Sequence, residues 1–203
     1  IPFAFSLAGT PVTKFCANKN GLVTFDTTVA GTTVDTSLNT NKSLPFAGLP
    51  NNTIAVWDNF SPALGSNDAV WVGTEGTAPN RQHWIVYHSY KIGGLSFGYF
   101  AIVLEETTNN VYLVDMNYAS GTGSFTKGVQ LSGTNAIQVT GSPNIPMAGG
   151  NLSATGNSFV TFAYGTCFPA SGLTAGSVTS SSFSASWSTM STPIASQLRY
   201  RPV

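Results

Sequence analysis

Apolar residues recur along most of the chain in short runs whose spacing suits β-strands. The stretch 20–25 (NGLVTF) has a turn signal followed by alternation of two faces. The stretch 52–60 (NTIAVWDNF) is almost continuously apolar, which is typical of a strand covered on both faces. Shorter apolar runs at 127–133, 136–141 and 157–165 predict further strands.

Two longer stretches predict β-hairpins. The first covers residues 69–92, with Gly76, Pro79 and Asn80 in the connection. Four neighbours in its second strand are expected to divide between the core and the outer face: Trp84 and Val86 against Ile85 and Tyr87. The second hairpin covers residues 96–118, and its turn lies between Glu105 and Asn110, where two asparagines favour left-handed backbone.

Helix signals are weak throughout, because windows of helical length contain glycine, proline or clusters of β-branched residues. Short strands separated by turns indicate an all-β fold, an antiparallel β-sandwich of jelly-roll type. We expect this sandwich to occupy residues 1–166. Residues 167–203 are expected to form a second, partial β-sandwich.

The last part of the chain predicts three strands, at 176–178, 183–187 and 197–201. Three strands do not close a sandwich, so this segment is expected to belong to a larger protein or to be completed by a neighbouring subunit. Completion by an identical subunit is a head-to-tail contact, which builds a filament. The apolar side chains expected to take part in self-association are Val178, Phe183, Trp187, Leu198 and Tyr200.

Composition narrows the classes of function. Charged residues make up 8% of the chain and the net charge is zero, so no basic surface for nucleic acid is expected. No apolar run is long enough to span a membrane. Cys16 and Cys167 are the two cysteines. We expect them to form one disulfide of an exported protein, and two buried free thiols are the alternative.

Residues able to carry chemistry do not converge in the sequence, so we expect no enzyme activity and no cofactor. His83 and His88 lie at odd spacing in one strand and are expected to point to opposite faces. Asp58, Asn59, Asn67 and Asp68 offer oxygen ligands for Ca²⁺, but loop caps at strand ends are the favoured interpretation.

Structural roles also account for the remaining candidate residues. Glu105 and Glu106 are adjacent in a turn and are expected to be solvated rather than a pair of catalytic carboxylates. The Asn-x-Ser/Thr sequons at Asn41, Asn51 and Asn151 predict loops. Aromatic residues that suit stacking on sugars are Trp71, Tyr90 and Tyr99, although core packing is the favoured role for most aromatic residues.

Five stretches in this order carry a family resemblance: IPFAF, NGLVTF, NNTIAVWD, GTAPNR and EETTNNVYL. Together they resemble a β-sandwich domain of large secreted bacterial surface proteins, with a layout also found in nidogen-like extracellular domains. The resemblance implies an extracellular protein of the kind exported by the type IX route.

The C-terminal segment resembles the first half of a fibronectin type III domain. The residues that carry this resemblance are the opening Pro169 to Leu173, Trp187 in the second strand, and LRYRPV at 198–203. Both resemblances are structural, and they specify a fold better than an activity.

Three functional hypotheses remain. We favour a non-enzymatic structural or adhesive protein of the bacterial surface, which binds copies of itself or other surface proteins and assembles into a filament. A carbohydrate-binding module is the second hypothesis, and it predicts a stripe of coplanar surface aromatics that binds a glycan. An ancillary domain of a larger secreted enzyme is the third.

Overall fold

The structure is a computed structural model that describes residues 1–28, 38, 40–58, 60–62, 68–92, 97–118, 124–146, 158–164, 171–178 and 183–188. Every regular element among these residues is a β-strand, which confirms the predicted fold class. The chain divides into two compact units, Ile1–Tyr164 and Gly165–Val203. Each unit is described by itself.

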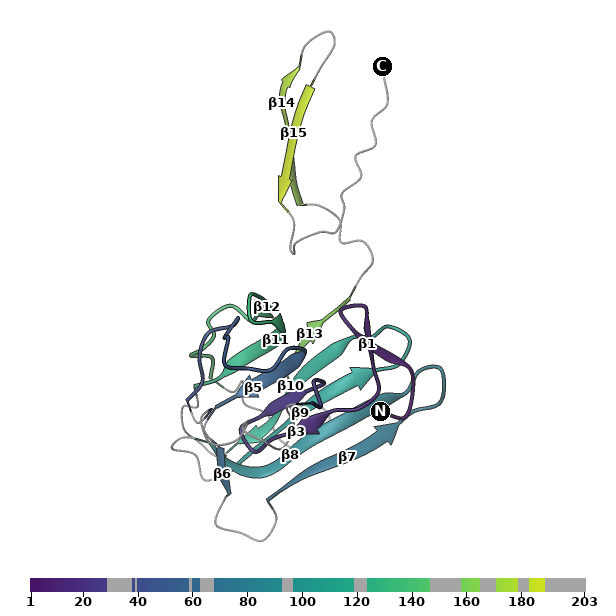
Figure 1. The fold of residues 1–203 in the computed structure, drawn as a ribbon, viewed down its shortest axis with the longest axis vertical. Helices are drawn as coiled ribbons and strands as arrows, with labels where there is room; N and C mark the ends of the chain where they lie inside the picture. The colour runs from purple at the N-terminus through teal and green to yellow at the C-terminus, as the bar shows by residue number, and fades with distance from the viewer. Residues whose placement is uncertain are drawn as a thin grey trace. The chain divides into compact units, whose positions relative to one another are not determined.

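The larger unit contains two antiparallel sheets that pack as a sandwich (Figure 1). The larger sheet has the order β13-β10-β9-β8-β6, and β7 also pairs with β8. Its strands are β6 (Phe60–Pro62), β7 (Ala69–Glu75), β8 (Gln82–Ile92), β9 (Gly98–Glu105), β10 (Val111–Tyr118) and β13 (Ser158–Phe162). The smaller sheet has the order β12-β11-β5-β4-β3, with β3 (Cys16–Ala17), β4 (Leu22–Thr24), β5 (Thr53–Trp57), β11 (Thr126–Ser132) and β12 (Asn135–Gln138). A separate hairpin is formed by β1 (Phe5–Leu7) and β2 (Thr10–Val12).

Both predicted hairpins are present. Strands β7 and β8 pair from Ala69↔His88 to Glu75↔Gln82, and Gly76 has a φ of 88° in their connection. The turn between β9 and β10 contains Asn109, which has a φ of 57° as its type allows.

The alternation predicted in β8 is confirmed. Ile85 and Tyr87 are fully buried in the cluster between the sheets. The Tyr87 ring stacks on Phe100 with 4.4 Å between ring centroids, and its hydroxyl donates to the Asn18 carbonyl at 3.0 Å. Trp84 and Val86 belong to a different cluster, on the outer face of the larger sheet.

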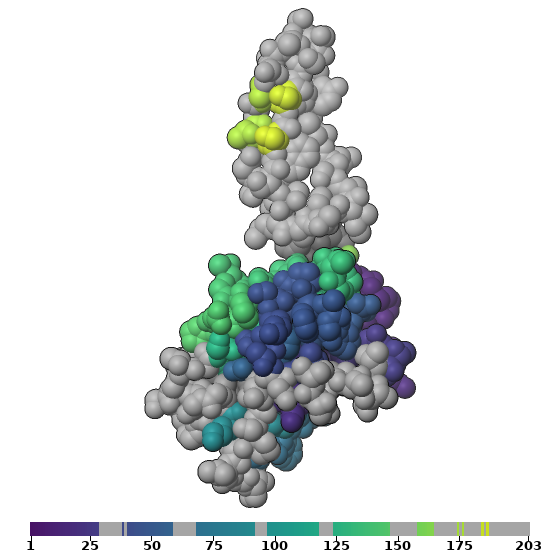
Figure 2. Space-filling view, turned by 60° about the vertical axis from the view of Figure 1, so that its left-hand side comes forward, coloured from purple at the N-terminus to yellow at the C-terminus, as the bar shows by residue number. Residues whose placement is uncertain are grey.

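The outer face of the smaller sheet is covered by the chain itself. All five residues of β5 are buried, which confirms the predicted strand with two covered faces. Ala55 and Trp57 pack with three leucines of the connecting segment, Leu38, Leu44 and Leu49. Figure 2 shows the segment that precedes β5 (blue) at the surface beside residues 124–146 (green).

Two glutamines hold this covering segment, residues 40–50. The Gln138 amide oxygen accepts from the Leu44 backbone N–H at 2.8 Å. The Gln130 amide oxygen accepts from the Phe46 backbone N–H at 2.7 Å, and its nitrogen donates to the carbonyls of Phe46 and Leu49 at 3.0 and 3.2 Å. Such bonds satisfy backbone groups that the apolar contact removes from water. The sequence pattern predicted cover on both faces of β5, but not which segment supplies it.

One ion pair lies in the interior. The Lys127 ammonium of β11 donates to both carboxylate oxygens of Asp115 in β10, at 2.7 and 2.6 Å. The two side chains are 4% and 6% exposed. The pair therefore joins the two sheets through charged groups that are almost removed from water.

The smaller unit contains the hairpin of β14 (Ser171–Val178) and β15 (Phe183–Ser188). This confirms the strands predicted at 176–178 and 183–187, although β14 begins five residues earlier than predicted. Val178 and Phe183 are register partners, and Trp187 lies in β15. The predicted strand at 197–201, with Leu198 and Tyr200, lies outside the described residues.

Candidate interaction surface

The outer face of the larger sheet carries a row of apolar residues across five strands. Side chains of directly opposed residues lie on the same face of a sheet. The pairings join Trp71 to Val86, Val86 to Ala101, Ala101 to Val114, and Val114 to Phe159. Strands lie about 4.8 Å apart, so the row extends about 19 Å from Trp71 to Phe159.

A second row lies beside it, two residues along each strand. The pairings join Gly73 to Trp84, Trp84 to Val103, Val103 to Tyr112, and Tyr112 to Thr161. We call the apolar residues of the two rows the outer-face patch, and its members are Trp71, Trp84, Val86, Ala101, Val103, Tyr112, Val114 and Phe159.

The patch is buried at its centre and open at both ends. Ala101 and Val103 have almost no exposed surface, because Trp84, Val86 and Tyr112 pack against them. Trp71 and Phe159, at the two ends, are 62% and 63% exposed. An antiparallel sheet usually presents polar side chains on its solvent side, so this face departs from the usual pattern.

Charged groups lie at the border of the patch and not within its rows. Glu105 accepts hydrogen bonds from the side chains of Thr108, Asn110, Tyr112 and, at 3.4 Å, Gln82. Burial raises the pKa of Glu105, but the four donors together lower it further, so the net direction is downward. The carboxylate thus fixes the Tyr112 hydroxyl at one edge of the patch.

The ring planes on this face are not parallel. The rings of Tyr112 and Phe159 are 5.8 Å apart at an interplanar angle of 73°, and those of His88 and Tyr99 are 4.7 Å apart at 84°. Neither pair forms the flat stripe that the carbohydrate hypothesis predicts.

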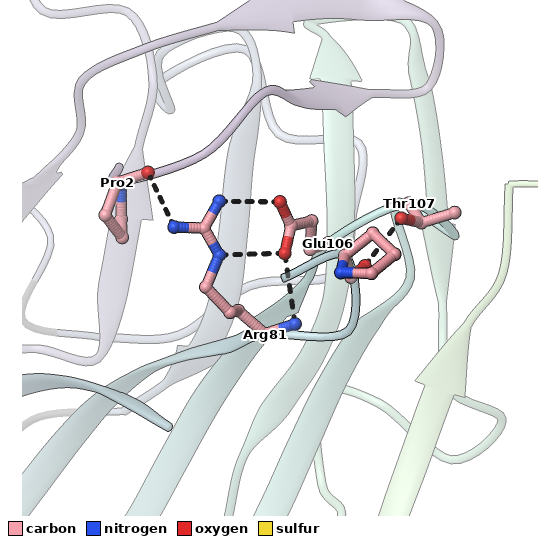
Figure 3. A network of polar contacts seen from close by, with 5 residues as sticks. Pro2, Arg81, Glu106 and Thr107 are labelled. Atoms are coloured by element: carbon pink, nitrogen blue, oxygen red, sulfur yellow. Dashed lines mark hydrogen bonds and ion pairs between the residues drawn. The ribbon is translucent and has the colours of Figure 1, made fainter. Parts of the chain in front are cut away.

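At one end of the sandwich, Arg81 connects three loops (Figure 3). Its guanidinium donates to both oxygens of Glu106 at 2.8 and 2.6 Å and to the Pro2 carbonyl at 3.4 Å. The Thr107 hydroxyl donates to the Pro79 carbonyl at 2.7 Å. Figure 3 shows these contacts joining the N-terminal segment to the β7–β8 and β9–β10 turns.

Arg81 and Glu106 stabilise each other's charged form. The hydrogen bond from Arg81 holds the pKa of Glu106 below its ordinary value, and the same bond raises the pKa of Arg81. The expectation that Glu105 and Glu106 are solvated is wrong, since both carboxylates are largely engaged by protein donors. Three of the five stretches that carry the family resemblance meet here, which gives them a structural role.

The two histidines have separate surroundings. His83 lies between the rings of Phe3 and Phe15, and its Nδ1 is 2.8 Å from the Thr74 hydroxyl. Burial, and secondarily the charge of the N-terminal ammonium, lower the pKa of His83. His88 contacts Tyr99 on the outer face. The structure therefore places them on opposite faces, as predicted.

The predicted oxygen ligands are only partly described. The Asp58 backbone N–H donates to the Asn20 carbonyl at 3.3 Å. One carboxylate oxygen of Asp68 is buried and makes no hydrogen bond to the described residues. Asn59 and Asn67 lie outside the described residues. Within the described ranges, no three His, Cys, Asp or Glu side chains gather as a metal site would require.

The structure describes two of the three predicted sequon positions. Asn41 and Asn51 lie in loops, as predicted, and the Asn41 amide donates to the carbonyls of Ser124 and Pro143. Asn151 lies outside the described residues.

Of the three aromatics, Trp71 is highly exposed. Tyr90 packs against the inner core beside Tyr87, and Tyr99 is half-buried against His88 and Phe97. Burial, and then the charge of Asp68, raise the pKa of Tyr90.

Cys16 is half-buried in β3 and forms no disulfide with any described residue. Its predicted partner Cys167 lies outside the described residues, so the disulfide stays a prediction. No helix in the described ranges is long and apolar enough to cross a membrane.

Sequence reasoning did not single out five members of the patch: Ala101, Val103, Tyr112, Val114 and Phe159. A signal for Tyr112 was present, because residues 111–114 (VYLV) are apolar at both alternating positions. Such a strand is expected to be covered on both faces. Phe159 gave no comparable signal, since its place in the row depends on pairing with β10.

Comparison with known protein families identifies a related family. The sequence pattern of the NIDO-related family, which is nidogen-related, matches residues 1–175. No curated protein and no solved structure matches the chain.

Proposed function

The chain belongs to the NIDO-related family, which fits an extracellular module, and we propose that it is a non-enzymatic structural or adhesive module of a bacterial surface protein. In this proposal the module holds copies of the surface protein together. The outer-face patch is the contact surface. Export by the type IX route belongs to the same proposal.

The observation that carries the proposal is the contrast between the two outer faces. Both are apolar, and the one on the smaller sheet is covered by the chain's own leucines. No described segment covers the patch on the larger sheet, where Trp71 and Phe159 remain largely exposed. Exposed apolar patches on soluble proteins commonly mark interaction sites.

The chemistry of the patch favours a protein partner over a glycan. Its two rows carry no charged side chain, so neither nucleic acid nor an anionic polysaccharide is complementary to it. Sugars stack best on flat aromatic surfaces, whereas the touching rings Tyr112 and Phe159 stand at a steep angle. An uneven apolar surface suits packing against protein side chains.

A role without catalysis is supported by what the titratable groups contact. His83 contacts two phenylalanine rings, Glu105 is engaged mainly by donors of its own hairpin, and Glu106 is engaged by Arg81 of the neighbouring hairpin. The hydroxyls that contact His83 and Glu105 are those of Thr74, Thr108 and Tyr112. Each lies in the same hairpin as the group it contacts, so these contacts are accounted for as structural hydrogen bonds.

Head-to-tail assembly through residues 167–203 is a second candidate. It is favoured by the β14–β15 hairpin, because a two-stranded sheet is marginal alone and each strand pairs on one side only among the described residues. Strand addition by a neighbouring subunit would complete such a sheet. The fibronectin type III-like character of this segment stays a prediction.

The test is homotypic clumping of beads that carry the full chain. Phe159→Ser is expected to reduce clumping several-fold, because it removes the most exposed ring of the patch. The matched control is Ile137→Ser, which removes a 48% exposed apolar side chain from the other sheet and is expected to leave clumping unchanged.

The same proteins are applied to glycan, peptide and ester panels. We expect no saturable glycan binding and no turnover. Glycan binding that Phe159→Ser abolishes would establish a carbohydrate-binding module instead. Turnover that depends on His83 or Glu105 would establish an enzyme.

A further inference from the structure

Strand β7 lies at an edge of the larger sheet. It pairs with β8 along its whole length, from Ala69↔His88 to Glu75↔Gln82. No other described strand pairs with β7, and β6 pairs with β8 further along, at Tyr90 to Ile92. Residues Trp71 to Glu75 are exposed. The outward backbone groups of β7 are thus open to another strand.

This edge lacks the features that usually prevent strands from pairing between molecules. Protected edges carry lysine, proline or a bulge, or are very short. Strand β7 has seven residues, none of them Lys or Pro, and its register with β8 has no irregularity. Its one charged residue, Glu75, is at the end of the strand. Trp71 and Val72 point to opposite faces and are 62% and 57% exposed.

We propose that β7 pairs antiparallel with β7 of a second copy of this chain, in a register centred on Val72. This deepens the proposed function by naming one homotypic contact, and it rests on the proposal that the module acts by protein contact. The contact joins two larger sheets edge to edge and makes their outer-face patches continuous.

Symmetry restricts the register. A twofold axis perpendicular to the sheet relates two antiparallel copies of one strand and keeps both outer faces on the same side. The axis then runs midway between the two copies of one β7 residue, which pair with each other, because directly opposed residues must point to the same face. Val72 is the middle residue of Ala69–Glu75, so only the register centred there pairs all seven positions.

Side-chain size favours the same register. Centring on Val72 places Trp71 opposite Gly73 of the second copy, on the outer face. A Cβ atom added at Gly73 would meet nothing within 4 Å, so the space beside this glycine accepts a ring. Aromatic residues opposite glycine are a known stabilising arrangement in sheets.

The alternative registers are poorer. Centring on Trp71 sets the two indole rings directly against each other, and centring on Gly73 sets Trp71 opposite the carboxylate of Glu75. In the register centred on Val72, Glu75 lies opposite Ala69, and no like charges meet.

The experiment is sedimentation equilibrium of the full chain over a range of concentrations. We expect a reversible dimer. Val72→Lys is expected to raise the dimer Kd by at least about tenfold, because two ammonium groups would face each other across the axis. Val72→Glu is expected to do the same with two carboxylates.

The decisive sample is an equimolar mixture of the two variants. The mixture is expected to restore the dimer, because the register places the ammonium group of one variant opposite the carboxylate of the other. Ile137→Lys, at an exposed position of edge strand β12, is the matched control and is expected to dimerise as the wild type does. Circular dichroism and thermal unfolding of each variant establish that it is folded.

A folded wild type that is monomeric at all concentrations would overturn the inference. So would a Val72→Lys protein that dimerises normally, or a mixture of the two variants that stays monomeric. Phe159→Ser lies outside the β7 contact, so loss of clumping in that variant with an intact dimer separates the proposed function from this inference.

Discussion

At the scale of single residues, the most consequential group is the ion pair of Asp115 and Lys127. Removing both charges from water is costly, and their mutual attraction offsets this cost only while both are present. The pair therefore makes the alignment of β10 with β11 depend on two side chains. Replacement of one partner leaves a buried charge, whereas replacement of both does not.

We predict that Lys127→Met or Asp115→Leu alone destabilises the protein by about 3–5 kcal/mol. The double substitution is expected to recover most of this loss. Urea unfolding of the four proteins measures the coupling between the two positions. Additive losses in the double variant would show that the two charges do not compensate each other.

Glu106 gives a prediction for pH dependence. Its folded-state pKa lies below the ordinary value of 4.5, because Arg81 donates to the ionised carboxylate. The stabilisation that Glu106 adds to the free energy of unfolding is therefore present above pH 4.5 and is lost as the pH falls through the lower folded-state pKa.

We expect Glu106→Gln to reduce the fall in the urea midpoint between neutral and acidic pH. Lys14→Ala changes an exposed cation of the N-terminal segment and is expected to keep the wild-type pH dependence. An unchanged pH profile in Glu106→Gln would show that its carboxylate is not ion-paired in solution.

At the scale of elements, the covering segment 40–50 is held by its own buried leucines and by hydrogen bonds to the side chains of Gln130 and Gln138. We predict that Gln130→Ala costs about 1–3 kcal/mol, because it leaves buried backbone groups of Phe46 and Leu49 without partners. Hydrogen exchange of the Phe46 amide is expected to accelerate.

The matched control is Gln82→Ala in the larger sheet. Gln82 makes one long side-chain contact to Glu105, so this change is expected to leave exchange at Phe46 as in the wild type. Equal acceleration in both variants would mean that Gln130 does not hold the segment specifically.

The sequence predicted elements better than the contacts between them. Alternation in β8 predicted the division of Ile85 and Tyr87 from Trp84 and Val86, and the apolar run at β5 predicted cover on both faces. These features depend on neighbours along the chain. The row from Trp71 to Phe159 depends on register between strands that are distant in sequence, so periodicity alone did not reveal it.

Polar contacts were the least predictable part. The side chain of Gln130 meets Phe46 across a long stretch of chain, and Arg81 meets Glu106 across two turns. No spacing rule connects such pairs. The interpretation of Glu106 as solvated failed for this reason, because Arg81 comes from another turn. Glu105 is engaged mainly within its own hairpin, by Thr108, Asn110 and Tyr112.

At the scale of the whole molecule, the core clusters formed by the described residues all lie within Ile1–Tyr164. We therefore predict that deletion of residues 172–203 leaves the larger unit folded, with an unchanged urea midpoint. If head-to-tail assembly operates, this deletion also abolishes it. A deletion variant that assembles as the full chain does would eliminate the C-terminal segment as a contact.

The predicted disulfide belongs to the same scale, because Cys16 and Cys167 lie in different units. Alkylation of the unfolded protein without reductant, followed by mass spectrometry, decides it. We expect no labelled cysteine. Two labelled cysteines would show that both thiols are free.

The central claim is that the outer-face patch becomes buried when copies of the chain associate. Oxidative footprinting of dispersed and clumped protein measures this side chain by side chain. We predict that oxidation of Phe159 falls several-fold on clumping, while that of Tyr164, an exposed aromatic outside the patch, changes little. Equal oxidation of Phe159 in the two states would contradict the claim.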